Sequence, residues 1–116
     1  MAIIRKIIIA TGVVTTLAGG GSGTSTDGTG TTASFNRPQG ITSDGTNLYV
    51  SDTNNHKIRK IVIATGVVTT LAGSTPFGST DASGIAAKFK KPRGITSDGT
   101  DLYVVDSANN KIRKIE

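Results

Sequence analysis

Few residues in this chain of 116 could perform chemistry, and none of them forms an obvious catalytic set. His56 is the only histidine, and one repeat period further along the chain the equivalent residue is Asn110. We therefore predict a turn residue at a strand start for His56 and no metal ligand or general base. Asp52 and Asp106 precede Asn-rich turns, where a carboxylate accepts turn N–H groups. We predict a structural role for both carboxylates.

The remaining patterns also argue against an enzyme. Asp27-Gly28-Thr29-Gly30 lacks the alternating acidic ligands of a calcium loop and the Gly-Lys-Ser/Thr ending of a phosphate loop. The absence of cysteine excludes a thiol nucleophile and a cysteine-based zinc site. We predict no catalytic residues, no metal and no cofactor.

An internal repeat organises the whole chain. Ile-Arg-Lys begins at residues 4, 58 and 112, so the period is 54, and residues 4–62 match residues 58–116 at 39 of 59 positions. This closeness indicates a recent duplication or an engineered sequence. Repeated units of this size bury their apolar surface by stacking on their neighbours. We treat residues 1–116 as one domain with strand-rich segments at 3–19, 38–73 and 92–115.

Each repeat resolves into short strands. Ile, Val and Thr supply 39 residues, which favours an all-β chain. The middle copy predicts antiparallel strands at 38–43, 48–52, 57–64 and 67–73. A Gly/Ser/Thr-rich crossover without a strong strand pattern follows the fourth strand at 74–91, as another does at 20–37. Predicted turn residues are Asp44, Gly45, Asp52, Asn55, Gly66, Asp98, Gly99, Asp106 and Asn109.

The apolar pattern favours sheets stacked around an axis. Residues 48–50 and 61–63 are apolar at successive positions, so both faces of the sheet need cover. The fourth strand contains Thr69 and Thr70, as expected of an outer strand. We place Arg59-Lys60, and the copies at 5–6 and 113–114, on the wet outer part of the third strand. Four-stranded antiparallel blades around an axis make a β-propeller.

The residues from Phe35 to Ile61 resemble the NHL repeat of bacterial propellers, and Phe89 to Ile115 resemble a second one. The TGVVTTLAG stretches and the Asp-x-x-Gly-x-x-Ala-x-Phe runs that begin at Asp27 and Asp81 are similar to longer members of that family. The resemblance implies a ring, commonly of six blades, that acts as a binding or scaffolding surface. Some propellers of this type are lyases with metal-bound histidines, and this chain has no residues to match them.

Two blades per chain cannot close a ring of roughly four to eight blades. We predict closure by head-to-tail oligomerisation into a six-bladed ring, with a trimer preferred and a tetramer or dimer as alternatives. The next chain's Val13 to Leu17 would add a fourth strand at the joint. This displaces one third-strand copy, 3–10 or 111–116, and we expect the shorter C-terminal copy to give way. The predicted assembly residues are Ile7, Ile9, Val13, Val14, Leu17, Ile112 and Ile115.

Basic residues provide the one hint of a ligand. The net charge is +5, and one propeller face should gather Arg37, His56, Lys57, Lys88, Lys90, Lys91, Arg93 and Lys111. Such a face attracts RNA or another polyanion, although with 4% aromatic residues base stacking is poorly served. A sugar-binding lectin is a further alternative, for which Tyr49 and Tyr103 are the available aromatic rings, and an ordinary protein ligand is another.

The first twenty residues could pass for a secretory signal, but their near-exact recurrence at 58–73 favours structure instead. No apolar run approaches the roughly 20 residues needed to span a bilayer. We expect a soluble chain with no signal peptide and no membrane partner. The compartment stays open.

Overall fold

The computed structural model describes residues 2–116 and is all-β, as predicted. Four short 3-10 turns lie between some of the strands, and no described residue belongs to an α-helix. None of residues 2–116 therefore forms a helix that could cross a membrane. The strands are β1 (Ile3–Ile7), β2 (Val14–Gly19), β3 (Gly28–Thr29), β4 (Pro38–Ser43), β5 (Asn47–Asp52), β6 (Lys57–Val62), β7 (Val67–Gly73), β8 (Pro92–Ser97), β9 (Leu102–Asp106) and β10 (Lys111–Ile115); the 3-10 turns are η1 (Gly30–Thr32), η2 (Thr53–Asn55), η3 (Gly84–Ala86) and η4 (Ser107–Asn109).

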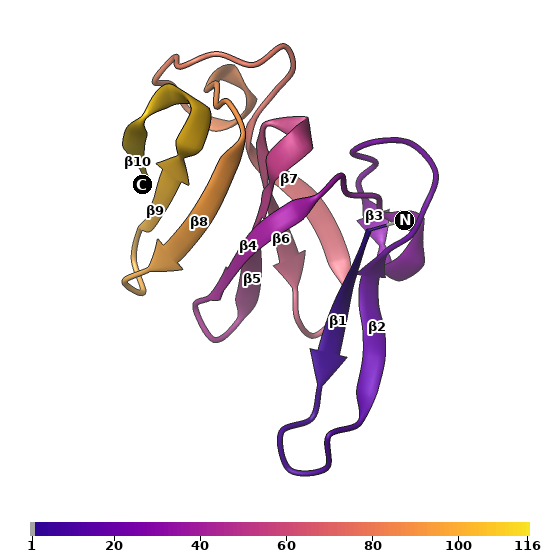
Figure 1. The fold of residues 1–116 in the computed structure, drawn as a ribbon. Coiled ribbons are helices and arrows are strands. Elements are labelled where there is room, and N and C mark those ends of the chain that lie inside the picture. Colours follow the sequence, from indigo (N-terminus) through magenta and orange to yellow (C-terminus); the bar gives the residue numbers. More distant parts are fainter. Residues whose placement is uncertain (1) are drawn as a thin grey trace.

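These strands form three antiparallel sheets that lie beside one another (Figure 1). The middle sheet has the order β3-β7-β6-β5-β4, so β4 to β7 make a four-stranded meander. The sheet β10-β9-β8 contains the first three strands of the next meander, and the β1-β2 hairpin corresponds to β6 and β7. The chain thus contains one complete blade between two partial ones.

The fourth strand is not the outermost strand of the middle sheet. Gly28 pairs with Val68 and Thr29 with Val67, so the two-residue strand β3 lies outside β7. The N–H of Gly30 also donates to the Gly66 carbonyl at 2.9 Å. The crossover at 20–37 therefore contributes a short strand that its Gly- and Thr-rich sequence did not predict. The third strand ends at Val62, two residues before its predicted end.

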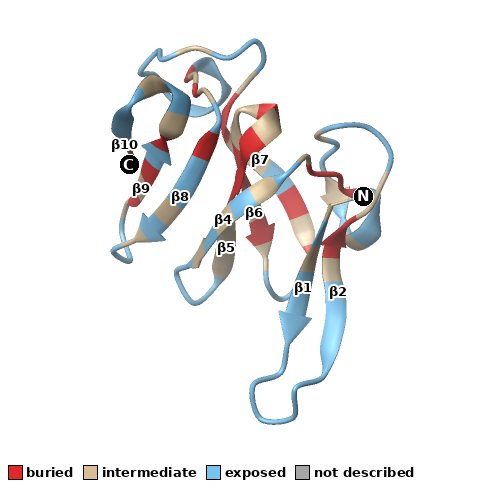
Figure 2. Cartoon of the chain, in the orientation of Figure 1, coloured by how far each residue is buried: buried red, intermediate tan, exposed pale blue. Residues whose placement is uncertain are grey.

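Two equivalent cores hold the sheets together (Figure 2). The first joins the β1-β2 hairpin and its crossover to the middle sheet, and the second joins the middle sheet to the β8-β9-β10 sheet. Ala18, Ala33, Phe35 and Val50 of the first core recur, 54 residues later, as Ala72, Ala87, Phe89 and Val104 of the second. The same blade-to-blade interface is therefore built twice, face to face, as neighbouring propeller blades are.

The tight turns follow from local chemistry. In the β4-β5 turn, Asp44 Oδ1 accepts the N–H groups of Thr46 and Asn47 at 2.9 and 2.8 Å. Gly45 occupies the left-handed region, with φ of 92°, where a side chain would be strained. The pair Asp98 and Gly99 repeats this arrangement in the β8-β9 turn.

Candidate functional site

A buried arginine, Arg59, lies beside Phe35 of the first core. The Arg59 side chain is fully buried and its guanidinium stacks 4.9 Å from the centre of the Phe35 ring. It donates to Ser34 O at 2.8 Å, Thr26 O at 3.0 Å, Asp27 Oδ1 at 2.9 Å and Asp52 Oδ2 at 2.9 Å. The cluster ties β6 to the end of β5 and to the crossover that begins the blade.

Arg113 repeats this cluster on β10. It donates to Asp106 Oδ2 and Lys88 O at 2.9 and 2.8 Å, to Thr80 O at 3.0 Å and to Asp81 Oδ1 at 2.6 Å. The prediction that Arg59 and Arg113 mark a wet outer surface is therefore wrong. Each is buried because a ring of carboxylate and carbonyl oxygens replaces its water. Arg5, the third copy, is exposed and makes no ion pair within residues 2–116.

Asp52 and Asp106 accept hydrogen bonds from beyond their turns as well as from the turn residues Asn55 and Asn109. Asp52 is fully buried, and the backbone N–H that it accepts is that of Asn36, from the crossover. Its other oxygen accepts from the Asn55 amide and from Arg59. Burial raises the pKa of the Asp52 carboxyl, and these hydrogen bonds oppose the rise. Asp106 has the same partners in the second copy.

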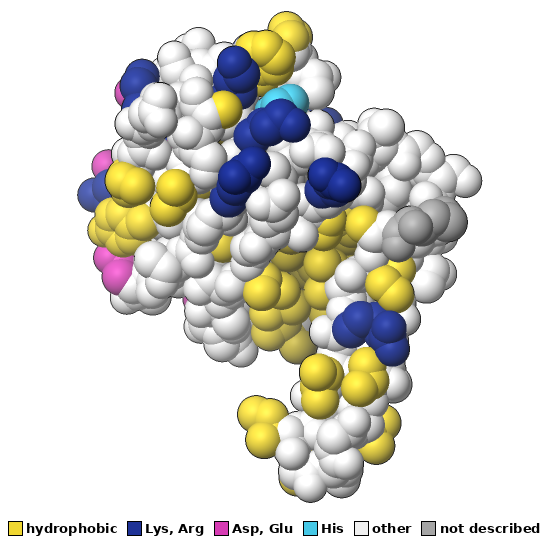
Figure 3. Space-filling view, viewed as in Figure 1, with side chains coloured by type: hydrophobic (Ala, Val, Ile, Leu, Met, Phe, Trp, Pro, Cys, Tyr) yellow, Lys and Arg dark blue, Asp and Glu magenta, His cyan; other side chains and the backbone are white. Residues whose placement is uncertain are grey.

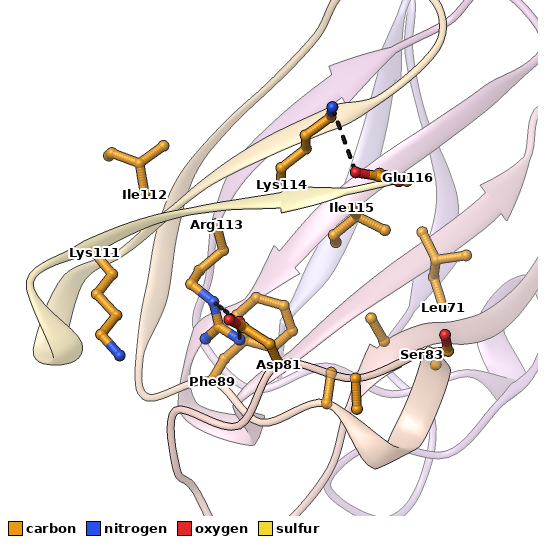
Figure 4. Close-up of a pocket in the computed structure, with 14 residues that line it drawn as sticks. Leu71, Asp81, Ser83, Phe89, Lys111, Ile112, Arg113, Lys114, Ile115 and Glu116 are labelled. Atoms are coloured by element: carbon orange, nitrogen blue, oxygen red, sulfur yellow. Dashed lines mark hydrogen bonds and ion pairs between the residues drawn. The ribbon is translucent and has the colours of Figure 1, made fainter.

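The outer edge of β10 borders an open groove of about 750 Å³, which we call the β10 groove (Figure 4). Its floor is apolar, with Ala72, Ala87 and Phe89 from the second core, and Ile115 and Leu71 lie toward one end. Its opposite wall is the crossover from Asp81 to Gly84. Among the described residues, no strand pairs with the free edge of β10.

The equivalent groove one repeat earlier is filled by β7. There, β7 lies between β6 and β3 and pairs with both of them. Its Val68 is only 1% exposed within the first core. The sequence of β7, Val67–Gly73, is identical to residues 13–19, which include β2. The apolar floor of the β10 groove, Ala72, Ala87 and Phe89, therefore corresponds to Ala18, Ala33 and Phe35, which belong to the first core together with Val68 of β7.

The predicted assembly residues are mostly uncovered. Ile7 is 60% exposed, whereas its repeat equivalent Ile61 is fully buried, and Val14 is 44% exposed against 1% for Val68. Ile9, Val13 and Ile112 are exposed as well. Leu17 and Ile115 are half-buried against the two cores. An apolar surface of this kind on several strands is typical of an unfilled interface.

The structure brings part of the predicted basic face together. The N–H of Lys91 donates to His56 Nδ1 at 3.0 Å, and Lys90 Nζ lies 4.6 Å from the centre of the Phe77 ring, which the His56 ring also contacts. Arg37 and Lys91 occupy equivalent positions, directly before β4 and β8, with positive φ. Figure 3 shows several Lys and Arg side chains gathered around the histidine. We call Arg37, His56, Lys90, Lys91 and Arg93 the basic rim.

The other predicted basic residues have different positions. Lys57 Nζ contacts Ser25 Oγ at 2.7 Å, and Lys88 Nζ contacts Ser74 Oγ at 3.1 Å, so both are tied to crossovers. Lys111 lines the β10 groove. Desolvation and the nearby cations Lys91 and Lys90 lower the pKa of His56. His56 has φ of 58° and precedes β6, which matches its interpretation as a turn residue.

Tyr49 and Tyr103, the aromatic residues considered for a sugar site, form hydrogen bonds with the turns beside them. The Tyr49 hydroxyl donates to Asp44 Oδ2 at 2.9 Å, and the Tyr103 hydroxyl donates to Asp98 Oδ2 at 3.1 Å. Within residues 2–116, no three His, Asp or Glu side chains are grouped so that they could hold a metal ion.

Comparison with known proteins agrees with this architecture. The NHL repeat pattern matches residues 35–61. NHL repeat-containing protein 2 of Homo sapiens is 37% identical over 95 residues, which make up 78% of this chain and 13% of that protein. Protein SUPPRESSOR OF QUENCHING 1, chloroplastic, of Arabidopsis thaliana is 40% identical over 94 residues, 78% of this chain and 9% of that protein. The chain thus spans a small part of these relatives.

A solved structure extends the likeness to nearly the whole chain. A structural genomics protein of unknown function from Bacteroides thetaiotaomicron superposes with a TM-score of 0.86 at 29% identity. The match covers 97% of this chain and 29% of that one.

Proposed function

Since the chain carries an NHL repeat of the β-propeller kind, we propose that its blades serve as a non-catalytic binding scaffold that is completed by further copies of the same chain. The NHL repeat is a propeller-type interaction module. Propellers bind their ligands on one face of a closed ring, so the ring must close before the chain can bind a ligand.

The observation that carries this proposal is the match between the β10 groove and β2. Inside the chain, residues 67–73 fill the groove between β6 and β3. The same seven-residue sequence at 13–19 has no strand on its outer side within the described residues, and the β10 groove offers the equivalent place. A second copy can therefore repeat, between chains, the seating of a fourth strand that the chain already makes once within itself, with β7 between β6 and β3.

Apolar burial makes such a joint favourable. Four strands of five residues present a face of roughly 300 Å². Covering it is worth on the order of 8 kcal/mol, and a joint covers one face on each partner. The stabilisation from covering both faces exceeds most estimates of the free-energy cost of association, about 4–15 kcal/mol. Because the contact is head-to-tail, copies add until the ring closes.

We propose a ring of six blades made by three chains. Each joint completes one blade from two chains, so every chain contributes two blades. The share of the Bacteroides structure that this chain matches, 29%, is close to the third that two of six blades would occupy. A homotrimer would have a mass of about 36 kDa, three times the 11.9 kDa of the chain.

Two substitutions on adjacent residues of β2 test the proposal. The equivalent of Val14 is Val68, which is buried in the complete blade, whereas the equivalent of Thr15 is Thr69, which stays exposed there. Val14→Asp should therefore abolish assembly and Thr15→Asp should leave it intact, measured by light scattering after size exclusion. Equal assembly of the two variants would contradict the proposed joint.

Polyanion binding by the basic rim is the second candidate function, and the clustering of His56, Lys90 and Lys91 favours it. A trimer would raise the net charge threefold, from +5 to about +15. Lys91→Glu should weaken the electrophoretic shift of single-stranded RNA, whereas Lys60→Glu, an equal charge change on β6, should not. An RNA affinity that changes neither with salt concentration nor with either substitution would contradict this candidate function.

A further inference from the structure

We infer that the β10 groove and the place of β10 itself are taken together by the complete β1-β2 hairpin of the next copy, which releases residues 111–116. The inference rests on the proposed head-to-tail assembly and identifies the segment that makes the joint. It concerns the third strand of the blade, which occurs three times, as β1, β6 and β10, although two blades need only two copies.

The joint has room for only one of two strands. A blade that begins with β8 and β9 needs one third strand and one fourth strand. The chain's own β10 and the neighbour's β1 both fit the third position, with Ile4, Arg5 and Ile7 equivalent to Ile112, Arg113 and Ile115. The neighbour's β2 supplies the fourth strand in either case. One third-strand copy must therefore leave the sheet.

The arginine site does not depend on β10. The oxygens that hold Arg113 belong to the end of β9 and to the crossover: Asp106, Asp81, Thr80 and Lys88. Phe89, on which Arg113 stacks, also lies outside β10. When β10 leaves, these groups stay in place and need a cation. Arg5 is exposed and unpaired within residues 2–116, so it can supply the missing guanidinium.

The docked hairpin would also cover the exposed carboxylate of the arginine site. In the full blade, Thr70 of β7 donates to Asp27 Oδ1 at 3.1 Å, and the Asp27 side chain is 50% exposed. Its equivalent Asp81 has no such neighbour and its side chain is 92% exposed. Thr16 is the counterpart of Thr70 on β2. A docked β2 would therefore cover Asp81 as β7 covers Asp27.

The hairpin is already built in the form that the joint requires. β1 and β2 pair from Ile3↔Gly19 to Ile7↔Val14, with a register shift after Ile4 that β6 and β7 repeat after Ile58. Its turn is closed by the N–H of Gly12, which donates to Ile8 O at 2.7 Å. The hairpin can therefore dock as one unit without rearranging its own hydrogen bonds.

The composition of the two competing strands decides which one leaves. Residues 3–9 contain five isoleucines, of which only Ile9 has an exposed equivalent, Ile63, in the complete blade, whereas residues 111–116 contain two. The second segment also carries Lys111, Arg113, Lys114 and Glu116, which hydrate readily. At the position where the complete blade has the half-buried Val62, the N-terminal copy has Ile8 and the C-terminal copy has Glu116. Main-chain pairing is conserved in either exchange, so apolar burial favours the hairpin.

Limited trypsin digestion of the assembled protein, read by mass spectrometry, tests which segment is free. We expect early cleavage after Lys111, Arg113 or Lys114 and protection of Arg5 and Lys6. Early cleavage after Arg5 or Lys6, with the C-terminal sites protected, would overturn the inference while leaving the assembly itself intact. A wild-type protein that remains a single chain would overturn the proposed function and this inference together.

A pair of adjacent substitutions provides a second readout. Arg5→Ala should weaken assembly roughly a hundredfold or more, because it leaves the Asp106 and Asp81 site of the neighbour without its cation. Lys6→Ala is the comparison variant: its equivalent at the joint, Lys114, makes a partly exposed ion pair with Asp101 at 3.6 Å, and the loss of such a pair costs little. Assembly constants would be measured by sedimentation over a range of chain concentrations. Equal constants for Arg5→Ala and wild type would contradict the exchange.

Discussion

Removal of the Arg59 guanidinium should be among the most damaging single changes in the chain. Arg59→Ala takes away four donated hydrogen bonds and leaves Asp52, which is fully buried, without its cation. Asp52 would keep two partners, the N–H of Asn36 and the amide of Asn55. Breaking a buried ion pair by removing one partner costs about 3–5 kcal/mol. Since native stabilities are about 5–15 kcal/mol, this is a large share of the total.

The contribution of Asp27 to this cost is smaller. Its side chain is half exposed, so water can replace the lost cation there. The magnitude therefore comes mainly from Asp52 and from the two carbonyls, Ser34 O and Thr26 O, which lose their donor. Arg59→Lys should recover part of the loss, because an ammonium restores the charge but not the planar fork.

Urea denaturation followed by far-ultraviolet circular dichroism measures this cost, with all variants at one chain concentration because assembly adds to stability. The control is Lys60→Ala on the same strand, which should change the free energy of unfolding by about 0.5 kcal/mol or less. A loss below about 1 kcal/mol for Arg59→Ala would refute the reasoning. It would mean that the buried cluster is no more stabilising than the apolar contacts that replace it.

Three further predictions concern turns and titration. Gly73→Ala should destabilise more than Gly45→Ala by urea denaturation: both have φ near 90°, but a Cβ at Gly73 would lie 2.5 Å from the His56 carbonyl, whereas Gly45 has open space. NMR titration should find the Asp44 pKa below the ordinary value of about 3.9, because N–H groups of its turn hold the carboxylate; its stabilisation is then present above the unfolded-state pKa and is lost as pH falls through the folded one. Lys91→Ala should raise the lowered pKa of His56 in proton NMR, because it removes a nearby cation.

Local features of the fold could be read from the sequence. Asp44-Gly45 and Asp98-Gly99 specify their turns through residues two or three positions away, and the structure has both turns as predicted. The 54-residue repeat likewise indicated equivalent sheets. These signals depend on short spacing or on direct comparison of copies, so they need no knowledge of neighbouring sheets.

The buried arginine cluster could not be placed in this way. Arg59 sits on a strand beside Lys60, and strand periodicity does not reveal that Asp27, 32 residues earlier, lies next to it. A signal was present nevertheless, because Asp27, Asp52 and Arg59 all recur one period later as Asp81, Asp106 and Arg113. Charged residues that repeat at fixed positions through a duplicated core are candidates for a buried ion pair.

Strand β3 and the scattered basic residues were missed for a related reason. Gly28 and Thr29 have no strand pattern of their own and pair with β7 only because the crossover passes beside it. The neighbours of Lys57 and Lys88 are Ser25 and Ser74, which lie on crossovers whose path depends on the packed blades. Tertiary contacts therefore decided both outcomes.

The mass of the protein in solution tests the central claim most directly. Light scattering coupled to size exclusion should give about 36 kDa, three times the 11.9 kDa of one chain, and the same value over a wide range of concentrations. A folded species of 11.9 kDa that persists when the protein is concentrated would contradict closure by copies of this chain.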